Sequence, residues 1–413
     1  MKRIGLVSLG LALGLVSTAN AQLTMQMSNG WTFTFAGNVN TFAYYEKSST
    51  SGSTPAAVAV GGIAPAGGVV NTTRLTVGLL PAFAVFDAKG KEGNTDLGVH
   101  FGFAPNVQCG TGINDCFGAQ IDMRQVYLTV GGAWGQLLVG RELGLFSRQN
   151  ILTDQTLFGI GATGNGTPGD GVGTTLGRIG FGYIYPNFRA QITYSTAAGK
   201  PAQFSIGIFE AAAVNNAPSS SVGGVTPPGP YTNTRYPRVE AELTYNAGGA
   251  KVWAGGVLQN VKTAPTGTTS SLTSWGGDGG FRYEKPTFSV TGSGYYGKGL
   301  GTTLFGLNGA CSIGTAPCTT SSSDGARKSY GFIGQLTVTP PNSKVTIAGS
   351  YGSSYLRASN VEQAIAATDF KTENTLVSGG IYYQATKSLK VVGEFDYWWT
   401  KGKLGGAQVG STN

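Results

Sequence analysis

The sequence is short of the residue types on which most catalytic and metal sites depend. Its 413 residues include one histidine and four cysteines, and only 12% of the residues are charged. The histidine, His100, lies between Val99 and Phe101, which we expect to face an apolar environment, so a Ser–His–Asp triad lacks a usable base. A zinc site would need further histidine or cysteine ligands beside the existing cysteines. We therefore expect no catalytic residues, no metal site and no cofactor, and no enzyme activity.

Long hydrophobic runs are also missing beyond the N-terminus. A basic start precedes an apolar run over residues 4–16, and Ala19 and Ala21 provide small residues for a cleavage site. This run is too short for a spanning helix, so residues 1–21 are predicted to be a secretory signal peptide and residues 22–413 the mature chain. No later segment reaches the roughly 18 apolar residues of a transmembrane helix. The sequence therefore excludes a helical membrane protein.

Charge of either sign is sparse, and the balance is basic. Without Lys2 and Arg3 of the signal peptide, 26 of the 28 basic residues remain against 20 acidic residues, so the mature net charge is +6. No dense basic run interleaves with aromatic residues, as a nucleic-acid surface would require. We expect no nucleic-acid partner, and we assign the excess positive charge to loops and to polar strand faces.

What the chain has in quantity is alternation of apolar and polar residues. One stretch alternates in this order: Asp96, Leu97, Gly98, Val99, His100, Phe101, Gly102 and Phe103. We expect two further stretches to present these residues on an apolar face: Leu75, Val77, Leu79, Phe83 and Val85, and then Val345 and Ile347. A period of two predicts strands with two chemically different faces. Because no helices cover so many strands, they predict a closed barrel, apolar outside and wet inside.

Fifteen strands can be predicted from this alternation. They lie at residues 30–45, 72–86, 94–104, 119–131, 134–142, 176–196, 202–213, 235–246, 250–262, 272–284, 286–298, 327–338, 344–357, 374–385 and 388–400. Bacterial single-chain barrels have an even number of strands, so we expect about 16 in the intact protein. Residues 401–413 are then predicted to be a loop, with the closing strand missing through a truncated C-terminus.

The predicted connections are of two kinds. Some are tight, such as residues 131–133 and 248–249, and others are long, such as residues 46–71, 143–175 and 299–326. Short turns at one rim and long loops at the other are typical of outer-membrane barrels. The predicted fold class is therefore all-β: a transmembrane antiparallel β-barrel that forms one domain in the bacterial outer membrane, in contact with its lipid.

Two segments resemble a known family. Residues 123–150 (MRQVYLTVGGAWGQLLVGRELGLFSRQN) resemble the strand, tight turn and next strand that precede the long third loop of trimeric Gram-negative porins. Residues 178–188 (RIGFGYIYPNF) resemble the strand that leaves this loop. The resemblance covers nearly the whole mature chain. It implies that the third loop folds into the lumen and that the protein is a homotrimer.

The resemblance also implies a set of pore-constriction residues. In such porins, basic side chains of the wall face acidic side chains of the third loop. By position, these are Arg74, Arg124, Arg141 and Arg178 on the wall, Asp154 and Asp170 on the loop, and Glu142 at the base of the loop. Opposed charges across a narrow water-filled gap orient polar solutes and filter ions. The alternative is that these arginines are solvated at the rim or paired with nearby carboxylates. A β-bulge near Arg124 would shift its register.

Alternation predicts further charged side chains on the wet face. These lumen-lining residues are Asp96, His100, Arg238, Glu240, Glu242, Lys390, Glu394 and Asp396. The pKa of a histidine lies near neutrality, so His100 could tune conductance, but a bystander role beside water is the simpler interpretation.

These features favour a passive porin, a water-filled channel through which small hydrophilic solutes and ions diffuse. The basic excess would give it a weak preference for anions. A solute-specific channel for anions or sugars would keep the same fold, but most aromatic residues share the lipid-facing parity, and the candidate arginines form only part of a basic ladder. A structural or adhesive surface barrel would place recognition in the long loops, whose Ser/Thr/Gly composition shows no distinctive motif.

The four cysteines form two pairs of identical spacing, Cys109/Cys116 and Cys311/Cys318. Each pair lies in a turn-rich segment between predicted strands. An exported protein meets an oxidising periplasm, so we predict two local disulfides in preference to a metal site.

We expect peptide mapping by mass spectrometry, without reduction, to find both local linkages. Each cysteine lies close in sequence to its predicted partner, which favours pairing within a loop over pairing between loops. The same digest after reduction and alkylation is the control, since it should release the linked peptides separately. A Cys116–Cys311 linkage, or free thiols in the unreduced protein, would contradict the prediction.

Overall fold

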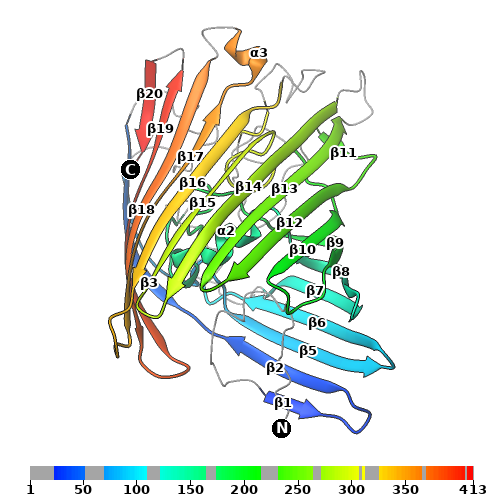
Figure 1. Cartoon of the computed structure of the whole chain (residues 1–413). Coiled ribbons are helices and arrows are strands. Elements are labelled where there is room, and N and C mark those ends of the chain that lie inside the picture. The colour runs from blue at the N-terminus through cyan, green and yellow to red at the C-terminus, as the bar shows by residue number, and fades with distance from the viewer. Residues whose placement is uncertain are drawn as a thin grey trace.

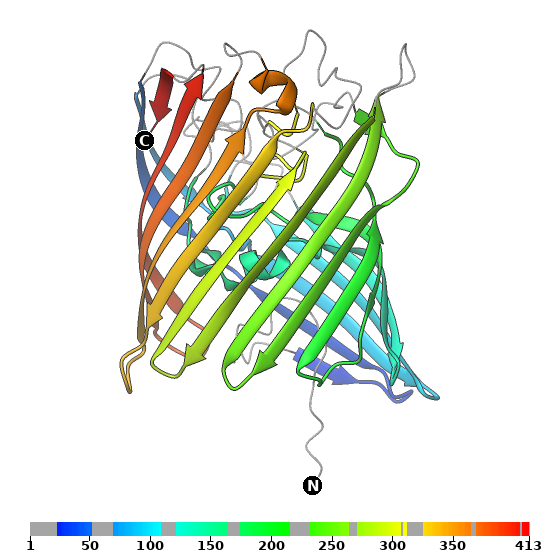
Figure 2. The ribbon, with the colours of Figure 1, turned by 45° about the horizontal axis from the view of Figure 1, so that its top comes forward.

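The structure is a barrel of antiparallel strands around a lumen that holds one long loop (Figures 1 and 2). This computed structural model describes residues 23–51, 69–108, 121–163, 174–214, 231–263, 271–306, 309–311, 325–364, 369–404 and 407–412. Helices in these ranges are short: α2 (Arg148–Thr153), η2 (Gln155–Phe158) and α3 (Asn360–Gln363). Among the described helices, none is long and apolar enough to cross a membrane.

Strands make up most of the described chain. In chain order they are β1 (Leu23–Gln26), β2 (Thr32–Asn38), β3 (Phe42–Ser51), β4 (Val69–Thr76), β5 (Phe83–Glu92), β6 (Thr95–Pro105), β7 (Ile121–Gly132), β8 (Gly135–Leu143), β9 (Phe188–Ser195), β10 (Ala202–Phe209), β11 (Tyr231–Asn233), β12 (Arg238–Ala247), β13 (Ala250–Thr263), β14 (Ser271–Lys285), β15 (Phe288–Lys298), β16 (Lys328–Val338), β17 (Val345–Arg357), β18 (Phe370–Gln384), β19 (Lys390–Leu404) and β20 (Ala407–Thr412).

Hydrogen-bonded neighbours follow chain order around the barrel, and each described pairing is antiparallel. β2 and β3 are two halves of one interrupted strand, as are β4 and β5, and β11 continues β12 along β13. β1 and β20 pair with opposite ends of the first strand. The described strands therefore form a sheet of 16 strand positions, which confirms the predicted barrel class and strand number.

The last described strand connects the end of the chain to its beginning. β20 pairs with β19 on one side and with β3 on the other, through Ser411 opposite Ser51 and Thr412 opposite Thr50. Our prediction that residues 401–413 are a loop was therefore wrong. The segment has little apolar/polar contrast, and backbone pairing with two neighbours sets its conformation instead.

The strand predicted at residues 176–196 is shorter in the structure. β9 begins at Phe188, and the residues before it belong to the loop inside the barrel. Gly177, Gly180 and Gly182 have φ values of 55°, 81° and 145°. Such left-handed backbone is readily adopted by glycine and cannot continue a strand. Residue alternation alone did not reveal these turns.

Strand faces separate as the alternation predicts. Val99 and Phe101 of β6 are 37% and 41% exposed, and Ile347 of β17 is 52% exposed, all on the outer face. His100, between the two β6 residues, is 5% exposed and faces inward. Outward rows of large apolar side chains are what a hydrocarbon-facing exterior requires.

One predicted strand departs from this regular alternation. Residues 77–82, between β4 and β5, fold toward the lumen, so Val77 (0% exposed) and Leu79 (4%) are buried and do not face lipid. The interruption shifts the alternation by one residue, and Phe83 and Val85 turn inward in β5. Our prediction for these four residues was wrong, because an irregular insertion has no fixed period.

Polar groups of the neighbouring segments satisfy the interrupted backbone. Asn40 Nδ2 donates to Leu80 O (2.8 Å), and Asn40 Oδ1 accepts from Gly78 N (3.0 Å). Leu79 N donates to Gly159 O of the inner loop (3.1 Å). Backbone polar groups at membrane depth need partners within the protein. The wall can be interrupted here because one asparagine and the inner loop supply them.

A substitution at Val377 can test which strand face points outward. Val377 lies in the middle of β18 and is 40% exposed on the outer face. We expect Val377→Arg to lower the free energy of unfolding by about 2–4 kcal/mol, because it places a charge in hydrocarbon. The matched control is Thr346→Arg, on the inner face of neighbouring β17, which should cost far less. Urea unfolding in phospholipid vesicles measures both. Equal losses in the two variants would contradict the assigned faces.

Candidate pore constriction

One long connection, residues 144–187 between β8 and β9, turns into the barrel. We call it the third loop; its described parts are residues 144–163 and 174–187. Figure 1 shows α2 of this loop within the barrel. Gly144 N donates to Asn187 O (2.8 Å), so the two ends of the loop lie side by side. The predicted long third loop in the lumen is thus present.

Carboxylates of the wall hold the root of the third loop. Glu240 Oε2 accepts hydrogen bonds from the backbone N–H groups of Leu145 (2.6 Å) and Phe146 (3.0 Å). Asp278 Oδ1 accepts from Ser147 N (3.2 Å). These bonds give partners to backbone donors that would otherwise be buried without one. Two strands, β12 and β14, therefore fix the point at which the loop enters the lumen.

Arginines neutralise two acidic groups at this root. Arg148 of α2 pairs with Glu242, with 2.5 Å between Nη2 and Oε1. Arg238 pairs with Glu240 within β12. The four side chains are nearly buried, and a buried charge requires such a partner. These groups contribute little net charge to the pore.

The tip of the described loop is held in the same way on the opposite wall. Glu394 Oε1 of β19 accepts from Ile160 N and Gly161 N, both at 2.7 Å. Thr163 Oγ1 donates to Glu46 Oε2 of β3 (2.5 Å). The loop is therefore tied to both sides of the barrel and crosses the lumen between them.

An ion pair lies inside the loop itself. Arg178 Nε is 3.8 Å from Asp154 Oδ1, and both side chains are 0% exposed. Asp154 also accepts from Thr156 N (3.0 Å) and Tyr183 Oη (3.0 Å), and Arg178 Nη1 donates to Leu376 O of the wall (2.8 Å).

Burial dominates the titration of this pair. It raises the pKa of Asp154, against the opposing effects of Arg178 and the hydrogen-bond donors, and it lowers the pKa of Arg178, against the effect of Asp154. We predicted Arg178 on the wall and both residues beside pore water. Instead both residues belong to the third loop, because the turns before β9 take Arg178 out of the wall strand, and both side chains are buried where the loop packs on the wall.

Arg124 lies at a β-bulge. The register of β7 against β6 places Gln125 and Met123 opposite consecutive residues and leaves Arg124 unpaired between them. The bulge turns Arg124 inward, where its Nε lies 2.8 Å from Asp122 Oδ2. Alternation without a bulge would have placed Arg124 on the outer face.

The remaining constriction candidates have different surroundings. Arg74 of β4 lies on the inner face, within electrostatic reach of Glu46. Arg141 of β8 is exposed, and its register opposite Val126 places it on the outer face, which corrects the predicted wall position. Glu142, the next residue, is 4% exposed at the base of the loop. Asp170 lies outside the described residues.

The charged residues predicted to line the lumen face inward, but the third loop covers most of them. Arg238, Glu240 and Glu242 are 1%, 1% and 4% exposed. They are therefore loop anchors rather than water-lining groups, a correction that follows from the loop packing against them. Asp96 remains exposed at the short-turn rim, 3.3 Å from Lys91.

Two further residues predicted to line the lumen are His100 and Asp396. His100 Nδ1 lies 2.8 Å from Asp87 Oδ1, and its ring stacks on Tyr127 with centroids 4.6 Å apart. Asp396 accepts from Ser378 beneath the loop. Both predicted lumen residues therefore face inward but already have partners within the protein.

The structure describes one of the four cysteines. Cys311 is buried and disulfide-bonded. Cys318, its predicted partner, lies outside the described residues, as do Cys109 and Cys116. The pairing of Cys311 with Cys318 and of Cys109 with Cys116 therefore stays a prediction. In the described part of the chain, no group of three or more His, Cys, Asp or Glu side chains could hold a metal ion.

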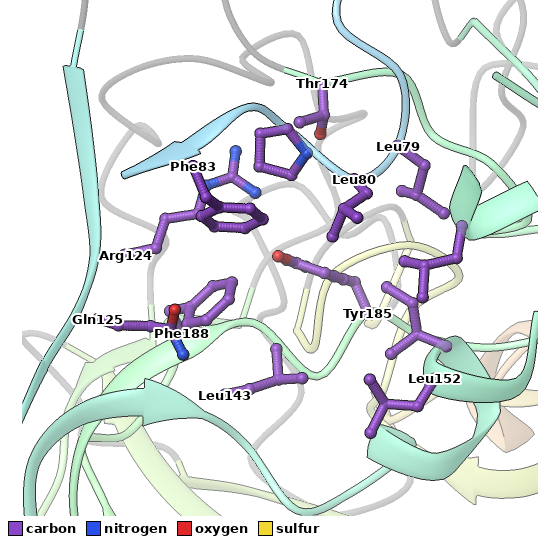
Figure 3. A pocket seen from close by; sticks show the side chains of 13 residues that line it. Leu79, Leu80, Phe83, Arg124, Gln125, Leu143, Leu152, Thr174, Tyr185 and Phe188 are labelled. Atoms are coloured by element: carbon purple, nitrogen blue, oxygen red, sulfur yellow. The ribbon is translucent and has the colours of Figure 1, made fainter. Parts of the chain in front are cut away.

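An apolar cavity of about 60 Å³ separates the third loop from the interrupted wall. Figure 3 shows Leu80 and Phe83 of the wall facing Leu152 and Tyr185 of the loop, with Arg124 at one side. Its lining is mostly aliphatic and aromatic, so it belongs to the packing behind the loop. We do not assign the aqueous pathway to it.

Sequence reasoning missed several residues that fix the loop, among them Glu46, Asp278, Gln335 and Tyr382. Asp278 stands in the run Gly276-Gly277-Asp278-Gly279-Gly280, where small neighbours leave room for a close backbone. A lone carboxylate on the inner face of a glycine-rich strand was an available signal. Its partner, Ser147, lies 131 residues away and could not be read from the sequence.

A 16-position antiparallel barrel with one loop folded into its lumen defines an outer-membrane channel. A family model described as Gram-negative porin matches residues 9–403, so the chain belongs to the Gram-negative porin family. It is a bacterial outer-membrane protein that forms a water-filled channel for passive diffusion of small hydrophilic solutes and ions.

Solved structures of outer-membrane proteins share this fold. The channel DcaP of Acinetobacter baumannii is 13% identical, with a TM-score of 0.60 over 94% of this chain and 97% of that chain. The anion-selective porin from Comamonas acidovorans is 13% identical, with a TM-score of 0.53 over 92% of this chain and 97% of that chain. At such identities the likeness shows the fold alone. No curated protein sequence matches the chain.

We expect Glu394→Ala to release the tip of the third loop, because two backbone N–H groups lose a charged acceptor. Hydrogen exchange at Ile160 and Gly161, followed by mass spectrometry, should accelerate by at least about tenfold, since a hydrogen bond to a charged group contributes roughly 1.5–3 kcal/mol. Asp96→Ala removes a carboxylate that does not touch the loop and should leave exchange unchanged. Unaltered exchange in the Glu394 variant would show that this residue does not hold the tip.

Proposed function

We propose that the protein is a general diffusion porin with a weak preference for anions, that the third loop forms its constriction, and that it acts as a homotrimer without enzyme activity. The loop crosses the lumen between Glu240 on one wall and Glu394 on the other. A solute passing along the barrel has to pass this loop. Membership of the Gram-negative porin family supports the trimer.

The basic excess of the predicted mature chain, 26 basic against 20 acidic residues, is the observation that carries the anion preference. Glu240, Glu242 and Asp154 are each paired with an arginine, so these pairs leave that excess unchanged. Each arginine pair cancels to zero net charge, so the remaining pore charge depends on side chains that still reach water. Arg74 lies among them, partly buried on the inner face and within electrostatic reach of Glu46. A basic excess along a water-filled path favours anions.

A solute-specific channel has weaker support. Several aromatic side chains do face inward, and two of them hold the loop. Trp253 Nε1 donates to Asn150 Oδ1 of α2 (2.9 Å), and Tyr382 Oη donates to Gln155 O (3.2 Å). Large rings such as Phe395 and Tyr383 lie exposed on the outer face. This arrangement favours loop fixation over a continuous aromatic track for sugars.

Planar-bilayer recordings of the purified protein test the proposal. We expect stepwise openings, and under a KCl gradient a reversal potential whose sign indicates preferred chloride flow. Arg74→Gln should lower the chloride-to-potassium permeability ratio by about twofold, because it removes an inner-face charge that surrounding water partly screens.

Arg141→Gln is the matched control, since it removes the same charge from the outer face and should leave the ratio unchanged. Absence of stepwise openings would overturn the channel assignment. A cation-selective reversal potential would overturn the anion preference alone.

A further inference from the structure

A second cavity lies between the third loop and the short-turn rim. It measures about 380 Å³, and its walls are the rim ends of β14–β19. Its roof is residues 152–158 of the third loop, as the lining by Thr153 and Phe158 indicates. Short turns face the periplasm in outer-membrane barrels. The cavity is therefore on the periplasmic side of the constriction.

Its roof is held in place by the wall. Gln335 of β16 makes two hydrogen bonds to the loop backbone: Nε2 donates to Thr153 O (3.1 Å) and Oε1 accepts from Gln155 N (2.7 Å). Tyr382 of β18 donates to Gln155 O (3.2 Å). A fixed roof keeps the cavity open, so its lining side chains hold a constant spacing.

Four basic side chains line this cavity: Arg282 and Lys285 of β14, Lys344 before β17, and Lys390 of β19. Lys390 Nζ lies 4.2 Å from the centre of the Phe158 ring, and Lys344 Nζ donates to Ala385 O (3.3 Å). Neither lysine forms an ion pair with a described carboxylate. Both positive charges therefore remain uncompensated within the described wall.

Acidic groups at the cavity do not cancel this charge. Glu284 Oε2 lies 2.9 Å from Arg282 Nε, so the negative charge of Glu284 compensates the positive charge of Arg282 alone. Asp154 is enclosed in the loop beside Arg178, with a side chain 0% exposed. The Nζ of Lys285 lies 5.2 Å from the centre of the Tyr283 ring. Because it is directed at this ring, we do not count Lys285 among the uncompensated charges of the cavity.

Hydroxyl groups complete the lining. Ser289 and Thr337 Oγ atoms are 2.6 Å apart, and Thr339 and Thr346 Oγ1 atoms are 2.7 Å apart. Ser289 and Thr337 lie on the adjacent strands β15 and β16, and Thr339 follows β16 beside Thr346 of β17. A hydroxyl group can rotate to donate to an anionic oxygen. The cavity thus combines positive charge with several neutral donors.

We propose that this cavity is a binding site for small anions that carry two or more charges, such as a diphosphate, on the periplasmic side of the constriction. The proposal rests on the diffusion-channel function, and it adds that the two ends of the channel differ in their affinity for such anions. Converging cations inside a low-dielectric wall concentrate anions, and the effect grows with ligand charge. A multivalent anion held here would obstruct the flow of monovalent ions, and more effectively when it arrives from the short-turn rim.

Inorganic pyrophosphate, added to one side of a planar bilayer in KCl, is the probe. Streptavidin binding to a biotinylated Lys200→Cys variant, labelled in the turn between β9 and β10, identifies the short-turn side. We expect half-block of the current at a concentration about tenfold lower from this side than from the long-loop side. Lys344→Gln combined with Lys390→Gln should raise that concentration by about tenfold while single-channel conductance persists.

Lys387→Gln is the matched control, because it removes a lysine from the same rim that does not line the cavity. Equal block from both sides, an unchanged half-blocking concentration in the double variant, or an equal effect of Lys387→Gln would each overturn the site. In all three cases KCl current would persist, so the diffusion channel would stand. Loss of all channel openings in the unmodified protein would instead overturn the proposed function.

Discussion

Hydrogen bonds from the backbone of the third loop to carboxylates of the wall are the interaction on which the pore depends. Glu240 binds two consecutive N–H groups at the root, and Glu394 binds two at the tip. These contacts hold the loop across the lumen. They also occupy oxygens of these carboxylates, so those oxygens are no longer available to a passing solute. The same bonds therefore set both the position of the loop and the groups that a solute can meet.

Much of the barrel could be predicted from sequence because a strand between lipid and water repeats every two residues. The outward row of β6, with Val99 and Phe101, follows directly from this period. Irregular segments carry no such period. The insertion at residues 77–82 and the glycine turns before β9 were therefore misread as strand, and β20 was misread as loop.

The candidate site was less predictable than the fold. Alternation places Glu240 and Glu242 on the inner face, but it cannot show that a loop covers them. That information lies in contacts between distant residues, such as Leu145 with Glu240, 95 positions apart. Arg141 and Arg178 illustrate the same limit, because a family position does not specify which way one strand residue points or where a loop turns. Side-chain identity suggested the chemistry, and only tertiary contacts assign it.

The interruption shared by the first two strands has a mechanical consequence. β3 and β4 pair with each other above it, and β2 and β5 pair below it, with no continuous ladder between the two ribbons. Other pairs, such as β18 with β19, keep one register along their whole length. Between the two ribbons, the covalent chain is supplemented by the hydrogen bonds of Asn40 and of the third loop. The barrel thus has a compliant seam on one side, and deformation of the wall there is coupled to the position of the loop that narrows the pore.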